Sequence, residues 1–213
     1  MKRYAKMFFP LIMVFAFANF AEAQTPGKEG EIKLHLNYNY GIPLGDFKNE
    51  LISNGSARGF SGDLLYQVNS KWAVGISAGY QDFVQKYPRA VYETGNHEST
   101  SAVLTNSIEI SLLMAKGIFT PLGGNGKMLQ PFISAGAGVN MLNFRQYLGE
   151  FGGADNSATF IAQAGAGVNL AFGKTKQSGF SIGADYNYVP YQRNGFGNMN
   201  SLGLHAGIYF PLK

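Results

Sequence analysis

Hydrophobic and polar residues alternate with a period of two in eight segments of the chain. Such alternation is typical of β-strands that have one apolar face and one polar face. The segments are dense in glycine, which weakens helices and so opposes a helical interpretation. They lie at residues 32–40, 60–68, 72–81, 107–114, 133–141, 160–172, 180–188 and 202–210. The pattern predicts an all-β protein, an eight-stranded antiparallel up-and-down transmembrane β-barrel.

The connections between the predicted strands alternate in length. Short or turn-rich links occupy 69–71, 121–126 and 174–178. The other links are longer, polar and aromatic, and occupy 41–57, 84–102, 143–157 and 190–200. Short turns at one end and long loops at the other are the pattern of bacterial outer-membrane barrels, whose long loops lie outside the cell.

The composition of the two strand faces indicates which one points outward. The polar face holds Gly, Ser, Asn and Gln, and only 14% of the chain is charged. A water-exposed face should carry many more charges, so we expect the polar face inside and the apolar face in lipid. On 107–114 this places Ile108, Ile110, Leu112 and Met114 in lipid. A soluble periplasmic ligand-binding β-barrel, with the faces reversed, is the alternative.

Aromatic residues on the apolar face gather at both strand ends, with aliphatic residues and Ala between them. Two aromatic belts around an aliphatic band suit a bilayer. The expected belt at the turn ends contains Trp72, Phe172, Phe180 and Phe210. The expected belt at the loop ends contains Tyr40, Phe60, Tyr80, Phe160 and Tyr188.

The first 23 residues have the features of a secretory signal peptide. A basic start is followed by the apolar run Met7 to Phe20, and Ala21-Glu22-Ala23 supplies small residues for a signal peptidase. The apolar run is short of the roughly 20 residues that a membrane helix needs. We therefore expect Sec-type export, cleavage between Ala23 and Gln24, a short polar leader at 24–30 and a barrel domain at 31–213.

Net charge and cysteine content exclude several classes of function. The segment expected to be cleaved carries three positive charges and one negative charge, so its removal lowers the net charge from +4 to +2. Nucleic-acid binding is not expected, because it needs a clustered basic face. The chain has no cysteine, so it forms neither disulfides nor thiolate metal sites.

The first predicted strand and its loop resemble a known family. Asn37-Tyr38-Asn39-Tyr40-Gly41-Ile42-Pro43-Leu44-Gly45-Asp46-Phe47 is similar to the opening of outer-membrane β-barrel domain proteins of Bacteroidota. The hexapeptide Ala-Gly-Ala-Gly-Val-Asn, at 135–140 and 164–169, resembles strands of the same group. The resemblance covers 31–213 and implies a small OmpA/OmpX-like or PorT-like barrel.

A few ionisable residues fall on the polar face and should point into the barrel. An eight-stranded barrel leaves little free lumen, and buried charges must pair or lose their charge. We therefore expect a hydrogen-bonded, salt-bridged plug, with a proton or cation pathway and a narrow porin-like channel as alternatives. The predicted interior network is Lys33, His35, Asp63, Glu109, Asp185 and His205.

Neither catalysis nor a metal or other cofactor is expected. Some outer-membrane barrels hydrolyse lipid A with a His and a Ser two residues apart on a strand. Here His205 is followed two residues later by Gly207, and His97-Glu98-Ser99 falls in a predicted loop. His35 and His205 lie on the first and last strands, which must pair to close the barrel, so the two could be cross-strand neighbours. A metal site needs three or four ligands, and the sequence supplies no obvious third one.

The long loops are rich in aromatic residues and arginine, a mixture that favours binding. Extension of the aromatic belt explains them equally well. These residues are Tyr87, Arg89, Tyr92, Tyr147, Phe151, Tyr191, Arg193 and Phe196. We expect a monomer with a structural or surface-binding role, whose partners are outer-membrane lipid, the barrel-assembly machinery and an extracellular ligand or protein.

Overall fold

The computed structural model describes residues 30–94, 98–123, 127–149, 151–173, 177–191 and 197–212. The predicted signal peptide therefore lies outside the described residues. The described chain is almost entirely strand, with one short helix, η2 (Phe47–Leu51). The strands are β1 (Ile32–Pro43), β2 (Ser56–Gln67), β3 (Trp72–Lys86), β4 (Ala90–Thr94), β5 (Glu98–Ala102), β6 (Leu104–Phe119), β7 (Leu129–Leu148), β8 (Phe151–Phe172), β9 (Ser178–Tyr188) and β10 (Ser201–Leu212).

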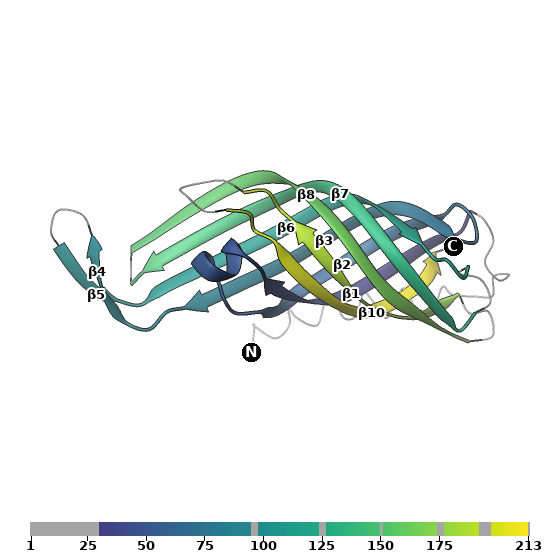
Figure 1. Ribbon diagram of the computed structural model, residues 1–213, viewed down its shortest axis with the longest axis horizontal. Helices are drawn as coiled ribbons and strands as arrows, with labels where there is room; N and C mark the ends of the chain where they lie inside the picture. The colour runs from purple at the N-terminus through teal and green to yellow at the C-terminus, as the bar shows by residue number, and fades with distance from the viewer. Residues whose placement is uncertain are drawn as a thin grey trace, which may run out of the picture.

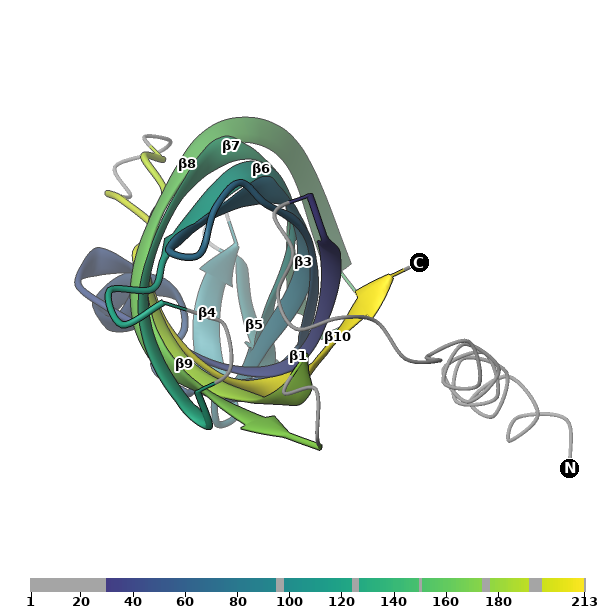
Figure 2. The same ribbon diagram turned by 90° about the vertical axis from the view of Figure 1, so that its right-hand side faces the viewer.

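Eight of these strands form one closed antiparallel barrel in the order β1-β10-β9-β8-β7-β6-β3-β2. The ring closes where β1 pairs with β10 along its whole length, from Ile32 opposite Leu212 to Pro43 opposite Ser201. Figure 2 looks along the barrel and shows this closed ring. The predicted fold class and strand number are confirmed.

The strands differ in length, and the long ones project from one end of the barrel. β7 has 20 residues and β8 has 22, whereas β9 has 11. In Figure 1 the ends of β7 and β8, with the separate β4–β5 hairpin, extend furthest to the left. We call this end the loop end and the opposite one the turn end.

The predicted loop at 143–157 is wrong. β7 and β8 stay paired up to Leu148 opposite Phe151, so this link is a tight hairpin. Residues 84–102 also contain the end of β3 and the β4–β5 hairpin. Sequence alternation weakens in the projecting part of β7 and β8 because both strand faces are at least partly exposed there.

The apolar face points outward in seven of the eight barrel strands, as predicted. Trp72, Phe60 and Ile133 are among the exposed large hydrophobic residues. Rings from neighbouring strands touch within both belts: Trp72 with Phe119 and Phe172 with Phe180 at the turn end, and Phe60 with Tyr80 at the loop end. Ring centroids in these pairs are 4.7, 5.3 and 5.5 Å apart, respectively.

The predicted orientation of 107–114 is wrong. Ile108, Ile110 and Met114 are buried, whereas Leu113 is 54% exposed on the outer face. Glu109 also lies on the outer face, opposite Asp82 of β3 and Asn143 of β7. The reason is that this part of the barrel interior is apolar, so an apolar strand face does not mark the outer side there.

None of the helices among the described residues is long and apolar enough to cross a membrane.

Candidate functional site

The barrel interior contains two chemically different regions. Buried charged, imidazole and hydroxyl side chains lie in the turn-end half, beside a small apolar cluster of Leu65, Ala73, Ile118 and Phe132. They form what we call the polar network: Glu31, Lys33, His35, Asp63, Ser77, Lys116, Ser134, Asp185 and His205. Apolar side chains fill the loop-end half and form what we call the apolar cap: Phe47, Leu51, Ile52, Phe83, Ile108, Ile110, Leu142, Ile161, Val189, Tyr191 and Met199.

Asp63 of β2 and Lys116 of β6 form the central ion pair of the polar network. Lys116 Nζ lies 3.0 Å from Asp63 Oδ2, and both side chains are nearly inaccessible to solvent. The Ser77 hydroxyl donates a hydrogen bond to Asp63 Oδ1 at 2.5 Å. Both carboxylate oxygens therefore have donors, which a buried carboxylate needs in order to stay charged.

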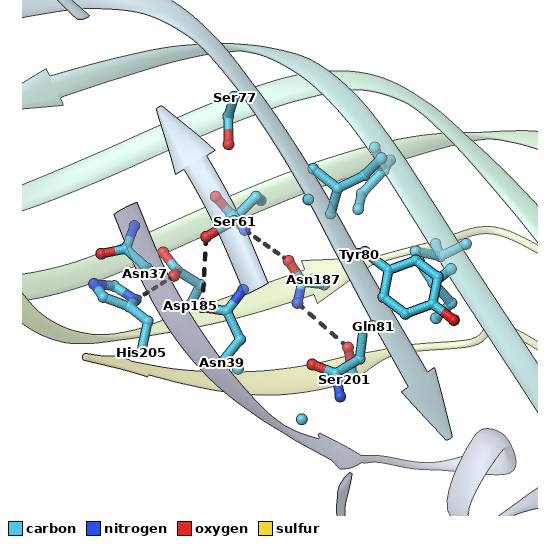
Figure 3. Close-up of a pocket in the computed structure, with 18 of the residues that line it drawn as sticks. Asn37, Asn39, Ser61, Ser77, Tyr80, Gln81, Asp185, Asn187, Ser201 and His205 are labelled. Atoms are coloured by element: carbon cyan, nitrogen blue, oxygen red, sulfur yellow. Dashed lines mark hydrogen bonds and ion pairs between the residues drawn. The ribbon is translucent and has the colours of Figure 1, made fainter. Parts of the chain in front are cut away.

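Asp185 of β9 and His205 of β10 form a second buried pair. His205 Nδ1 and Asp185 Oδ2 are 2.7 Å apart, and the Ser134 hydroxyl lies 3.5 Å from Asp185 Oδ1. Figure 3 shows His205 pointing toward Asp185. The carboxylate, rather than the imidazole, is next to the Ser134 hydroxyl. This arrangement differs from a hydrolytic triad, in which the imidazole contacts the nucleophile.

Lys33 and His35 of β1 complete the network near the turn end. Lys33 Nζ lies 3.5 Å from Glu31 Oε2. His35 stacks on Tyr209, with ring centroids 5.1 Å apart. The register places His35 opposite Tyr209 and His205 opposite Asn39. The two histidines are therefore not cross-strand neighbours.

Glycines on adjacent strands make room for these large interior side chains. A Cβ atom at Gly183 would lie 2.7 Å from the His205 ring, and one at Gly179 would lie 2.7 Å from the Tyr209 ring. Both distances are below van der Waals contact. Glycine on β9 therefore leaves the space that these two rings of β10 occupy.

A small cavity of about 70 Å³ lies between the polar network and the apolar cap. Its lining includes Asn37, Asn187 and His205 (Figure 3). Gln163 also lines it. Asn37 Oδ1 and Gln163 Oε1 are buried and lack a protein hydrogen-bond partner among the described residues. A polar cavity of this size has room for water, which would satisfy such atoms.

The apolar cap is built by the barrel wall together with a segment from outside it. Phe47, Leu51 and Ile52, in and after η2, are each at most 3% exposed. The Phe47 ring packs edge-on against Phe83 of β3, with centroids 5.1 Å apart. The Leu51 carbonyl accepts hydrogen bonds from the Tyr87 hydroxyl and the Asn106 amide. The segment is thus fixed over the loop end by packing and by hydrogen bonds.

Five of the six predicted interior residues lie inside the barrel, and Glu109 does not. The Glu109 carboxylate pairs with Arg145 on the outer face at 2.9 Å, and both side chains are partly exposed. Sequence reasoning missed Glu31 and Lys116, which supply the partners of Lys33 and Asp63. The alternation at 107–114, continued by two residues, puts Lys116 on the same strand face as Ile108 and Met114. That face would then have been assigned to the interior, because a lysine in the middle of the strand is not expected in lipid.

The predicted loop-binding residues that the structure describes have different surroundings. Tyr191 is buried in the apolar cap, Tyr87 is hydrogen-bonded to Leu51, and Tyr147 is 43% exposed on β7. Arg89 is exposed and Tyr92 half-buried near the β4–β5 hairpin. Phe151 begins β8, and Arg193 and Phe196 lie outside the described residues.

Among the described residues, no group of three or more His, Asp or Glu side chains is arranged to hold a metal ion. The absence of a cofactor and the absence of catalysis both stay predictions.

Comparison with solved structures identifies related folds. Neisserial surface protein A matches with a TM-score of 0.52 and 13% identity over 87% of this chain and 98% of that one. The N-terminal β-barrel domain of Pseudomonas aeruginosa OprF matches with a TM-score of 0.44 and 17% identity, over 85% of this chain and 99% of that one. The Escherichia coli outer membrane protease OmpT matches with a TM-score of 0.42 and 8% identity, over 90% of this chain and 99% of that one.

No protein-family model and no curated protein matches the chain. The resemblance to barrels of Bacteroidota therefore stays a prediction. At the level of fold, the chain is a closed eight-stranded antiparallel β-barrel of the kind found in Neisserial surface protein A.

Proposed function

We propose that this chain is an integral outer-membrane β-barrel with a closed interior, and that its role is structural or binding, through the part that projects beyond the membrane. One observation carries the proposal. The outward face is apolar and edged by two aromatic belts, and β3, β6, β7 and β8 continue past the belt at the loop end. A belt-edged apolar face suits a bilayer, and strands that pass it must stand in water.

The direction of insertion follows from the connections. In bacterial barrels the short turns face the periplasm and the long connections face the outside. The β4–β5 hairpin and the β7–β8 hairpin share the loop end, opposite the tight β2–β3 turn at 68–71 (Figure 1). We therefore place the projecting strands outside the cell, as the surface that would meet an extracellular ligand or protein.

The filled interior argues against the narrow porin-like channel. A water-filled path would have to pass the apolar cap, in which Ile52 and Ile108 are fully buried. It would also have to pass the Asp63–Lys116 pair. Buried side chains occupy both regions, and an eight-stranded barrel has little room to widen.

The soluble ligand-binding alternative requires the opposite distribution of side chains. Such a barrel lines its cavity with apolar residues and shows polar ones to water. Here Phe60, Met141 and Phe180 are more than half exposed on the outside, while Asp63 and His205 are buried inside. Exposing so much apolar surface to water would favour aggregation.

Single-cysteine labelling tests both the location and the orientation. The chain has no native cysteine, so each introduced thiol is unique. We expect a membrane-impermeant maleimide to label Val91→Cys, at the 69%-exposed position on β4, in intact cells. Lys71→Cys, in the exposed β2–β3 turn, should react only after the outer membrane is permeabilised.

Two further measurements complete the test. The chain should be recovered in the outer-membrane fraction and should migrate differently on gels before and after heating. Ile133→Cys, on the apolar face, should stay unlabelled until the protein is extracted into detergent and unfolded. Equal labelling of Val91→Cys and Lys71→Cys in intact cells, or recovery of the protein in the soluble fraction, would refute the proposal.

A further inference from the structure

A row of polar side chains crosses the outer face just beyond the loop-end aromatic belt. Its members are direct register partners on five successive strands, and they are Arg58, Asp82, Glu109, Asn143 and Asn156. Arg58 Nη1 lies 3.1 Å from Asp82 Oδ2. Arg145 joins the row by pairing with Glu109 and by donating from Nε to Asn143 Oδ1 at 3.0 Å. We call this set the outer polar row.

In the register row directly beneath this one the aromatic belt is interrupted on β6, β7 and β8, and Phe160 of β8, which also belongs to the belt, lies one row further toward the turn end. The neighbouring register row reads Phe60, Tyr80, Ser111, Met141 and Ala158 from β2 to β8. Its first two positions are stacked aromatic rings. Its last three are a hydroxyl, a flexible thioether and a methyl group, none of which has an aromatic ring to place at a membrane interface.

A shallow hollow occupies the interruption. It has a volume of about 460 Å³ over β6, β7 and β8, and its lining includes Glu109, Asn143 and Asn156 above and Ser111, Met141 and Ala158 below. The hollow is thus polar on its upper side, where Glu109, the ion-pair partner of Arg145, is its charged lining residue. On the side toward the bilayer it continues into the exposed apolar residues Leu113, Val139 and Phe160.

The two arginines keep most of their hydrogen-bonding capacity free for an outside partner. A guanidinium has five N–H donors. The contacts described for Arg58 use one of these donors and those for Arg145 use two. The Arg58 side chain is 67% exposed. Arginine binds phosphate with two parallel hydrogen bonds, and these are stronger than neutral ones.

We propose that the hollow and the outer polar row bind a phosphorylated membrane lipid. Arg145 and Arg58 bind the phosphate of the headgroup, and the hollow over Met141 and Ala158 receives the start of an acyl chain. The site takes an anion because the free donors belong to guanidinium groups, and it takes a lipid because the hollow opens onto the apolar face. The inference rests on the proposed membrane location.

Native mass spectrometry of the full chain, folded in a neutral detergent, tests this inference. The probes are phosphatidic acid, the diacylglycerol with the same acyl chains, and inorganic phosphate. We expect the protein to retain phosphatidic acid and to retain neither of the other two. Equal retention of diacylglycerol would show a purely apolar contact, and equal retention of phosphate would show a simple anion site. Either result would overturn the proposal.

Two sets of variants separate charge from shape. Arg58→Gln with Arg145→Gln should weaken phosphatidic acid binding about tenfold, the loss expected when charge-assisted hydrogen bonds are removed. Ser111→Phe should fill the hollow and weaken binding while keeping both arginines. Lys48→Gln, at an exposed position in η2, is the matched control and should leave binding unchanged.

A heat-modifiability gel shows that each variant is folded before its binding is measured. The double variant Arg58→Lys with Arg145→Lys separates charge from hydrogen-bond geometry. It keeps both positive charges but loses the two parallel N–H donors that each guanidinium offers to a phosphate. We expect it to bind between the wild type and the glutamine variant. Wild-type binding by the folded glutamine variant would overturn the lipid site. Recovery of the wild type in the soluble fraction would instead overturn the proposed location.

Discussion

The two halves of the barrel interior are filled by different means. In the turn-end half the barrel strands supply most of the described filling side chains, and these include the buried pairs Asp63 with Lys116 and Asp185 with His205. In the loop-end half a separate segment, Phe47 to Ile52, packs onto strand residues such as Phe83 and Ile108. Charges can fill a barrel only where each finds a partner. Apolar filling has no such pairing requirement, and a loop can provide it.

The difference between the halves explains which parts of the structure the sequence predicted. Seven strand faces were assigned correctly because a polar interior stands opposite an apolar exterior along them. The eighth face was reversed because β6 passes through the apolar cap, where Ile108 and Ile110 point inward. In that region the interior and the lipid favour the same residue types, so alternation identifies the strand without identifying its outer side.

The candidate site was predictable only in part for a related reason. Lys33, Asp63 and Asp185 were placed inside from their alternation alone. Their partners depend on register and barrel closure, and β2 and β6, which carry Asp63 and Lys116, are not even adjacent in the ring. The length of β7 and β8 was also missed, because Gly152 and Gly153 indicate a loop by composition, whereas the pairing extends to Phe151.

The largest effect is expected from breaking the central ion pair. Asp63→Leu leaves Lys116 buried without its partner and should lower the free energy of unfolding by about 3–5 kcal/mol. Urea titration of the protein refolded in lipid vesicles measures this value. The double variant Asp63→Leu with Lys116→Met is the control and should recover most of the loss, since no buried charge remains. A double variant as unstable as the single one would argue against this pairing.

A slightly smaller effect is expected in the apolar cap. Ile108→Ala removes a fully buried side chain and should destabilise the folded barrel by about 2–4 kcal/mol through lost burial and the cavity it leaves. Leu113→Ala, on the exposed outer face of the same strand, provides the comparison. The same urea titration should show a smaller change for Leu113→Ala. Equal losses at the two positions would contradict the inward orientation of Ile108.

The glycine positions beneath the polar network allow a third test. A methyl group at Gly183 would meet both the His205 ring and the Ala166 carbonyl oxygen, each 2.7 Å from the added Cβ. Gly183→Ala should therefore cost about 1–3 kcal/mol of stability through overpacking. Gly117→Ala is the control, because its nearest atom would lie at 3.9 Å. A shift of the His205 imidazole resonances in the Gly183 variant alone would confirm the contact.

The smallest effect is expected on the outside of the barrel. The Glu109–Arg145 pair is partly exposed, and such pairs contribute about 0–1 kcal/mol. Arg145→Gln should therefore change the free energy of unfolding by no more than this amount, and less in high salt. A loss as large as that of Asp63→Leu would mean that Glu109 is buried after all. Urea titration of the wild type and of Arg145→Gln, each at low and at high salt, measures this change in the free energy of unfolding.

The central claim is that both halves of the barrel interior are closed to water. The most direct test is to measure the planar-bilayer conductance of the purified full chain. The protein should first be shown to be folded by its heat-modifiable migration. We predict that this folded protein inserts without producing discrete current steps, because the apolar cap and the Asp63–Lys116 pair block the water path in series. Reproducible current steps from the folded protein, absent when a heat-unfolded sample is added, would contradict the account.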